Sequence, residues 1–287
     1  MKPDPRFLKQ PKHFWANVRS ISQHIGYTER GTKRIKVPEL PAMTSAFKEL
    51  GLVSSHILQD NGEPSEFGLS LAAYFKHRAQ VLNDVVRLNL MNASKARKAF
   101  EGLRSRLKPC CPLPLNKQKG NKKAEAFFTG IVNMLIEANA GGLPCDYNPL
   151  DLTAITFQGA PLRTLARRVD GAFPSTINPI AVWEIKEYYY TTTFGSRVAD
   201  GVYESLLDGM ELEELREQEK IDVKHYLMVD DYNTWWNMGR SYLCRMVDML
   251  HMGYVDEVLF GSEVLERLPA IVKEWVAMAK KRKRLRS

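Results

Sequence analysis

Asp170, Glu184 and Lys186 are the residues whose types and spacing point most directly to chemistry. In the segment 182–188, the two-residue period of a strand puts Glu184 and Lys186 on one face. Asp170 ends the preceding strand candidate just before Gly171, and it can meet Glu184 if the two strands are neighbours. Two carboxylates at close range repel each other unless a cation lies between them, and hard oxygen ligands suit Mg²⁺. With a lysine that orients or deprotonates water, this group predicts metal-dependent cleavage of a phosphodiester.

Alternating helices and strands must position these residues. Hydrophobic side chains recur with helical spacing or gather in short apolar runs along the second half of the chain. They predict helices over 124–138, 197–218, 235–252 and around 265–275, and strands over 151–157, 162–170, 180–190, 224–229 and 255–260. Three adjoining strands followed by further strands that alternate with helices predict an α/β fold, with a mixed sheet and helices on both faces.

The first third of the chain predicts a separate, mainly helical unit. We expect helices over 14–25 and 40–50, a hairpin around the Asn-Gly pair at 61–62, and a long helix from Gly68. This order resembles a winged helix-turn-helix, with 41–50 as recognition helix and 55–64 as wing. The resemblance implies DNA contacts from Lys33, Arg34, Lys36, Thr44, Ser45 and Lys48. The same fold also serves dimerisation or protein contacts, and that alternative stays open.

Residues 108–123 predict the domain boundary. They carry three prolines, one glycine and no acid, so they neither continue a helix nor pair well as a strand. We therefore expect a winged-helix domain over 1–107, a basic linker over 108–123 and a second domain over 124–287.

The charge balance favours a polyanionic partner. Lys and Arg number 41 against 33 Asp and Glu, which gives a net charge of +8, and ten of the basic residues fall between Ser94 and Lys123. The four cysteines lack metal-ligand spacing and are interpreted as reduced thiols. No apolar run approaches the roughly 20 residues that span a bilayer, and the N-terminus lacks a signal-peptide pattern. We therefore expect a cytoplasmic protein without membrane contact.

The arrangement of Asp170 and Glu184-Ile-Lys186 resembles the PD-(D/E)xK nuclease signature. The predicted α-β-β-β-α-β order from Ala124 to Val229 is similar to the core of that superfamily. Glu125, before the first strand, matches an additional acidic position of many members. Val169 stands where the motif has proline, which is a departure from the pattern.

The resemblance implies a type II restriction endonuclease of prokaryotes. Such an enzyme is a homodimer that cuts palindromic double-stranded DNA, leaves 5′-phosphate and 3′-hydroxyl ends, and has a cognate DNA methyltransferase. It further implies that Asp170, Glu184 and the main-chain carbonyl of Ile185 bind Mg²⁺, that Lys186 positions and activates water, and that Glu125 is an auxiliary acid. Candidates for reading bases, taken from position alone, are Thr191, Thr192, Thr193, Arg197, Asn233 and Arg240.

Three alternatives remain at this point. Glu184 and Lys186 can be a cross-strand charge pair, with Asp170 merely starting a turn. The protein can be a winged-helix transcriptional regulator without catalysis. It can also be a repair or phage-defence nuclease of the same superfamily, which would depend on DNA structure or modification rather than on a short sequence.

Overall fold

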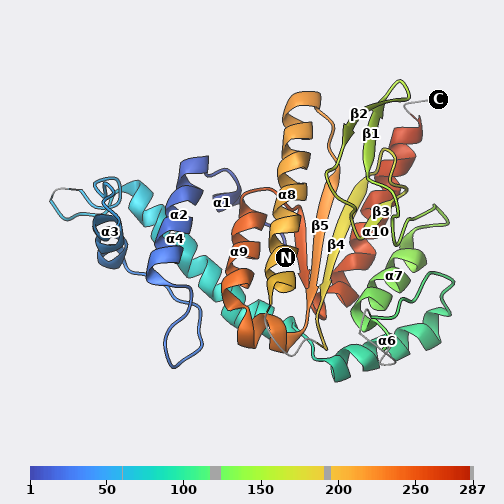
Figure 1. Ribbon diagram of the computed structural model, residues 1–287, viewed down its shortest axis with the longest axis horizontal. Coiled ribbons are helices and arrows are strands. Elements are labelled where there is room, and N and C mark those ends of the chain that lie inside the picture. Colours follow the sequence, from blue (N-terminus) through green and yellow to red (C-terminus); the bar gives the residue numbers. More distant parts are fainter. Residues whose placement is uncertain (60, 117–123, 191–194, 285–287) are drawn as a thin grey trace.

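A four-stranded sheet forms the centre of the molecule (Figure 1). The computed structural model describes residues 1–59, 61–116, 124–190 and 195–284. The strand order is β3-β4-β5-β6, in which β3 is antiparallel to β4 while β5 and β6 continue parallel to it. Their bounds are β3 Gly171–Phe173, β4 Ala181–Glu187, β5 Lys224–Asp230 and β6 Glu257–Phe260. A separate antiparallel hairpin consists of β1 Ala154–Phe157 and β2 Ala160–Thr164.

Helices cover both faces of this sheet, which confirms the expected mixed α/β fold (Figure 1). On one face lie α7 Phe127–Asn139 and α10 Glu263–Arg284, with α6 Ala93–Leu107 packed on α7. On the other lie α8 Ser196–Glu219, η2 Asn233–Met238 and α9 Arg240–His251. The rings of Trp183 on β4 and Trp275 on α10 stack at 5.5 Å in the first of these layers, so β4 is buried on both faces.

The N-terminal unit is helical, and its first four helices pack around a small aromatic core. The helices are α1 Pro5–Leu8, α2 Lys12–Ile25, α3 Leu40–Glu49, α4 Glu66–Gln80, η1 Val81–Val86 and α5 Arg87–Asn89. Phe14, Trp15 and Tyr74 meet edge to face within this core. Here α2 and α3 match the predicted helices within about two residues. The expected hairpin is reduced to one bridge between Leu58 and Pro64, because residues 55–57 form a turn instead of a strand.

A buried ion pair joins the N-terminal unit to the sheet-containing part. Arg78 on α4 donates two hydrogen bonds of 3.0 Å to Asp248 on α9, and Tyr74 donates a third to the same carboxylate. The amino group of Met1 donates to the carbonyl of Val258 on β6. Because a lone buried charge would be costly, these contacts hold α4 in one position against α9.

Two sequence predictions about the region of the candidate site are wrong. The expected strand over 162–170 ends at Thr164, and residues 165–170 form a bend before β3. The main-chain amide of Ala166 donates its hydrogen bond to the side chain of Glu211 on α8, instead of to a neighbouring strand. The helix expected from 124 begins at Phe127, and Glu125 lies before it in a bridge with Leu115.

Candidate functional site

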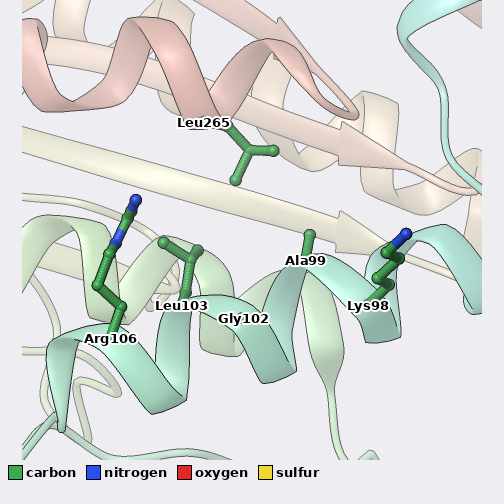
Figure 2. Close-up of a pocket in the computed structure, with 6 residues that line it drawn as sticks. All are labelled: Lys98, Ala99, Gly102, Leu103, Arg106 and Leu265. Carbon is green, nitrogen blue, oxygen red and sulfur yellow. The ribbon is translucent and has the colours of Figure 1, made fainter.

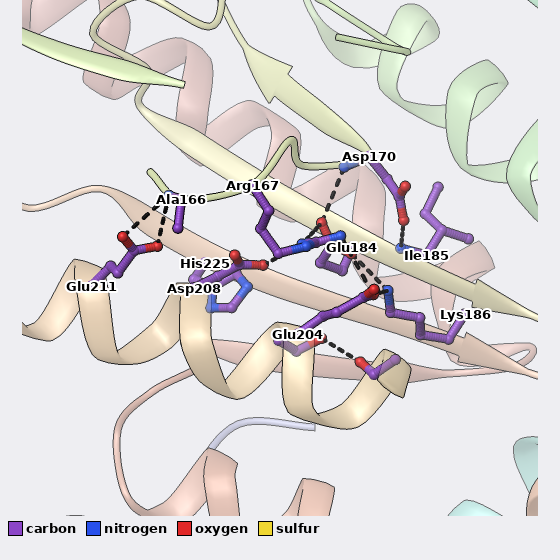
Figure 3. Close-up of polar contacts among 12 residues, drawn as sticks. Ala166, Arg167, Asp170, Glu184, Ile185, Lys186, Glu204, Asp208, Glu211 and His225 are labelled. Carbon is purple, nitrogen blue, oxygen red and sulfur yellow. Dashed lines mark hydrogen bonds and ion pairs between the residues drawn. The ribbon is translucent and has the colours of Figure 1, made fainter. Parts of the chain in front are cut away.

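The pairing of β3 with β4 brings Asp170 next to Glu184. Gly171 is opposite Trp183, and a side chain at 171 would place its Cβ 2.1 Å from the indole ring, so glycine is needed there. The amide of Asp170 donates to Glu184 Oε1 at 3.1 Å, and the amide of Ile185 donates to Asp170 Oδ2 at 2.8 Å (Figure 3). The predicted convergence of the two carboxylates is therefore present, although Asp170 precedes β3 and does not end β2.

Beyond Trp183, the edge of β4 beside Asp170 is no longer paired with β3. The described ladder with β3 stops at that residue, and the Asp170 carboxylate takes the next amide, that of Ile185. In a strand, the N–H and C=O of one residue point to the same side. The Ile185 carbonyl therefore faces the same edge as Asp170.

Lys186 and Glu184 share the face of β4 that is covered by α8. Lys186 Nζ donates to Glu184 Oε2 at 2.7 Å, and both side chains are almost completely buried. Gly201 on α8 lies directly over this lysine, since a Cβ there would be 3.0 Å from Lys186 Cδ. The absence of a side chain at 201 thus leaves room for Lys186 beneath the helix.

Arg167 links this pair to acids on α8 that sequence reasoning missed. Its guanidinium is 2.9 Å from Glu184 Oε1 and 2.6 Å from Asp208 Oδ2, and it also reaches Glu204. Glu204 Oε2 accepts a hydrogen bond of 3.1 Å from Lys186 (Figure 3). The signal in the sequence is the spacing of four between Glu204 and Asp208, which puts both acids on one helical face. Nothing in that spacing names Arg167 as their partner.

The charges of this cluster shift its pKa values in opposite directions. Burial and the Glu184 charge raise the pKa of Asp170 to about 6, and the same two causes raise that of Asp208 to about 7. Burial alone would raise the pKa of Glu184, but Lys186 and Arg167 outweigh it and lower the pKa. Burial alone would lower the pKa of Lys186, but the negative charge of Glu184 outweighs burial and raises it. Lys186 is therefore a protonated donor here, which favours orienting water over deprotonating it.

The residues fit a divalent cation held by oxygen ligands. Among the described side chains, four carboxylates share the cluster with two cations, and the buried Asp208 Oδ1 has no hydrogen-bond partner there. In the same part of the chain no group of three or more His, Cys, Asp or Glu side chains is arranged around one metal position. The predicted ligand set needs only two, Asp170 and Glu184, with the carbonyl of Ile185 as a third oxygen.

Residues 91–275 match the model of a protein family described as a domain of unknown function, DUF7687. The chain belongs to this family. A second domain of unknown function, DUF7690, matches residues 1–85. No match was found among curated proteins or among solved structures.

The DUF7687 segment contains the whole cluster and also α6, which lies before the predicted linker over 108–123. Within the described residues, no helix is long and apolar enough to cross a membrane.

Glu125 is not brought into contact with the other three predicted catalytic residues. Its carboxylate is 3.0 Å from Arg104 on α6, and its side chain is 38% exposed. Of the base-reading candidates in the same segment, Asn233 accepts a hydrogen bond from Asn237, and Arg240 donates to the carbonyl of Trp236. Thr191, Thr192 and Thr193 lie outside the described residues, as does the side chain of Arg197.

The other predicted DNA contacts, in the DUF7690 segment, differ in their exposure. Exposed positions are occupied by Lys33, Arg34, Ser45 and Lys48. Lys36 is half-buried and donates to the carbonyl of Ile25, whereas Thr44 is buried and donates to the carbonyl of Pro41. Because Thr44 is buried, it is not part of the exposed surface of α3.

Proposed function

We propose that this protein is a Mg²⁺-dependent endonuclease that acts on double-stranded DNA. The observation that carries the proposal is the convergence of Asp170, directly before β3, with Glu184 and Lys186 of β4, where the pairing of β4 with β3 ends. The antiparallel pair β3–β4, followed by α8 and by β5 parallel to β4, supports a restriction-endonuclease-like core, although four strands instead of the expected three lie between α7 and α8, and β1 and β2 form a separate hairpin. The helices α2 to α4 with the Leu58–Pro64 bridge support a winged helix-turn-helix as the DNA-reading unit.

Each residue has a distinct role in this proposal. Asp170, Glu184 and the carbonyl of Ile185 hold Mg²⁺, while protonated Lys186 orients the attacking water through its N–H groups. When bound, the metal supplies polarisation of that water and offsets negative charge on the phosphate. Glu184 is ionised, as a metal ligand must be, because Lys186 and Arg167 lower its pKa. Glu125, paired with Arg104, is left with a weaker, auxiliary role.

The finer version of the proposal is a type II restriction endonuclease of the prokaryotic cytoplasm. A homodimer on a palindromic site, 5′-phosphate ends and a cognate methyltransferase belong to it. A repair or phage-defence nuclease would use the same cluster. Discrete DNA fragments would indicate the restriction endonuclease and not the repair or phage-defence nuclease, since only a sequence-specific enzyme produces them.

The test is incubation of plasmid and phage DNA with purified protein, in Mg²⁺ and in EDTA, alongside the Lys186→Ala variant. We expect cleavage only with Mg²⁺ and a loss of at least about 100-fold in the variant, which is the usual cost of removing a donor that positions or stabilises the reacting groups. Lys224→Ala is the matched control. Lys224 lies on the neighbouring strand β5 and also contacts two carboxylates, those of Asp222 and Asp256, but it is outside the cluster. This variant should keep wild-type cleavage.

A second function is favoured by one observation, the pairing of Glu184 with both Arg167 and Lys186. These pairs would also suit a purely structural ion network in a DNA-binding regulator. If wild-type protein shifts DNA on a gel equally with and without Mg²⁺ and leaves every substrate intact, the nuclease proposal is wrong and the regulator is supported.

A further inference from the structure

The exposed face of α6 is strongly basic. Ala96, Phe100 and Leu103 are buried against the core, Ala99 and Leu107 are half-buried beside them, and most of the other positions of the helix are exposed. Between residues 93 and 108 the only acid is Glu101, and the exposed basic residues are Lys95, Arg97, Lys98, Arg104, Arg106 and Lys108.

Most of these charges are not neutralised by neighbouring side chains. Arg97 pairs with Glu101 at 2.8 Å, and Arg104 pairs with Glu125 at 3.0 Å. Across the described part of the chain, no ion pair is formed by the other four, which are Lys95, Lys98, Arg106 and Lys108. The face therefore presents a net positive charge that an anionic partner can neutralise.

Two of the unpaired cations stand at the ends of an open cavity of about 410 Å³ (Figure 2). Lys98, Gly102 and Arg106 follow one another at intervals of four residues, so they form one stripe along the helix. Ala99, Leu103 and Leu265 from α10 line the rest of the cavity. Gly102 has open space above it, so the middle of the stripe is a bare main chain that a ligand can approach closely.

The dimensions suit a chain of phosphates better than a single small anion. Eight residues separate Lys98 from Arg106, which is about 12 Å along the helix axis. Charges on one DNA strand follow at roughly 3.4 Å of axis, so the two cations can bind phosphates about three to four nucleotides apart.

This face lies beside the end of β4 that carries the candidate site. The helix α6 packs on α7, and Thr129 in the first turn of α7 donates two hydrogen bonds of 2.9 Å to Glu187, the last residue of β4. Figure 1 shows α6 crossing the end of the molecule where β4 and β5 terminate. Helix α6 and the C-terminal end of β4 therefore lie at the same end of the molecule.

We propose that the face of α6 around Lys98, Gly102 and Arg106 binds the sugar-phosphate backbone of duplex DNA. This inference rests on the proposed function, and it adds a DNA surface outside the winged unit. The contact is with phosphates, so it strengthens binding without selecting a sequence.

The test compares two double charge reversals. Lys98→Glu with Arg106→Glu changes the α6 face, and Lys220→Glu with Lys273→Glu changes two exposed lysines, one directly after α8 and one on α10, by the same total charge. Binding of a fluorescent 20-base-pair duplex is followed by anisotropy in EDTA, over a series of salt concentrations. We expect the α6 variant to lose at least about tenfold in affinity and to lower the salt slope by about 2, because each phosphate contact contributes roughly 0.9. The control should keep the wild-type slope.

The outcomes separate this inference from the proposed function. If wild-type protein binds and cuts DNA but the α6 variant keeps its salt slope, the α6 surface is wrong and the nuclease proposal stands. If wild-type protein does not bind duplex DNA, both fail. Tighter binding of an RNA duplex of equal length would overturn the assignment to DNA. Lys98→Gln with Arg106→Gln, checked by circular dichroism, replaces the reversal should the glutamates impair folding.

Discussion

Arg167 holds the carboxylate on which the proposed chemistry depends. It contacts both oxygens of Glu184, and its side chain is 23% exposed while that of Glu184 is fully buried. A divalent cation needs at least one of these oxygens. Asp208 and Glu204 already contact the same guanidinium, so they can retain it when Glu184 is released. In the proposed function, metal binding and the Arg167–Glu184 pair therefore compete.

We predict that Arg167→Gln binds Mn²⁺ about tenfold more tightly than the wild type. The reason is the loss of a competing charge-assisted hydrogen bond, worth roughly 1.5 kcal/mol. Titration followed by electron paramagnetic resonance of free Mn²⁺ measures the affinity. Arg163→Gln is the control, because Arg163 also links the segment before β3 to an acid of α8, Glu214. Equal affinities in all three proteins would contradict the competition.

The elements around the site depend on close approach at one glycine. Gly171 starts β3 against the ring of Trp183, and this contact fixes the register that puts Asp170 beside Glu184. On the other side of β4, α8 brings Glu204 and Asp208 over the same strand. The site is therefore a product of strand register and helix packing together.

We predict that Gly171→Ala destabilises the protein by about 1–3 kcal/mol, the usual cost of overpacking a core. Its Cβ would lie 2.1 Å from Trp183, so the strand must move away. Gly102→Ala on α6 has open space and should instead stabilise the protein by about 0.5–1 kcal/mol. Urea unfolding of the two variants measures both effects. A Gly171→Ala variant as stable as the wild type would show that the register tolerates a side chain.

At the scale of the whole molecule, buried carboxylates connect parts that are distant in the sequence. Asp248 accepts hydrogen bonds from Arg78 and Tyr74 of the N-terminal unit. Asp230, at the end of β5, accepts hydrogen bonds from the amide of Met91 and the hydroxyl of Tyr189. Burial raises the pKa of Asp230 to about 7, although its hydrogen bonds oppose this. The carboxyl group is thus protonated in the folded protein over a pH range in which it is ionised in the unfolded chain.

This shift predicts a loss of stability as the pH rises from about 4 to about 7. The folded state binds the extra proton between the ordinary value of 3.8 and about 7, so the free energy of unfolding falls across that window and is level above it. Asp230→Asn should reduce the fall by about 2–4 kcal/mol, measured by urea unfolding at pH 4.5 and 7.5. The exposed Asp84→Asn is the control, and it should leave the wild-type fall intact. A fall of wild-type size in Asp230→Asn would exclude Asp230 as its source.

Much of the fold can be predicted from local patterns alone. Hydrophobic periodicity places α2, α3, α8 and β5 close to their observed bounds, because amphipathic elements bury one face whatever their neighbours are. The same patterns place Glu184 and Lys186 on one face of a buried strand, since the two-residue period of a strand is a local property.

Only the tertiary structure decides what surrounds that strand. The local sequence does not indicate the bend over 165–170 or the short β3. Their main-chain amides donate to groups elsewhere in the chain, such as Glu211 for Ala166 and β4 for β3. Arg167, Glu204 and Asp208 join the site only once α8 packs over β4, and Glu125 is left outside it with Arg104. The sequence by itself determined the residue types and their faces. Their charges became one cluster through long-range packing, because hydrogen bonds and ion pairs depend on distances in space that spacing along a chain does not specify.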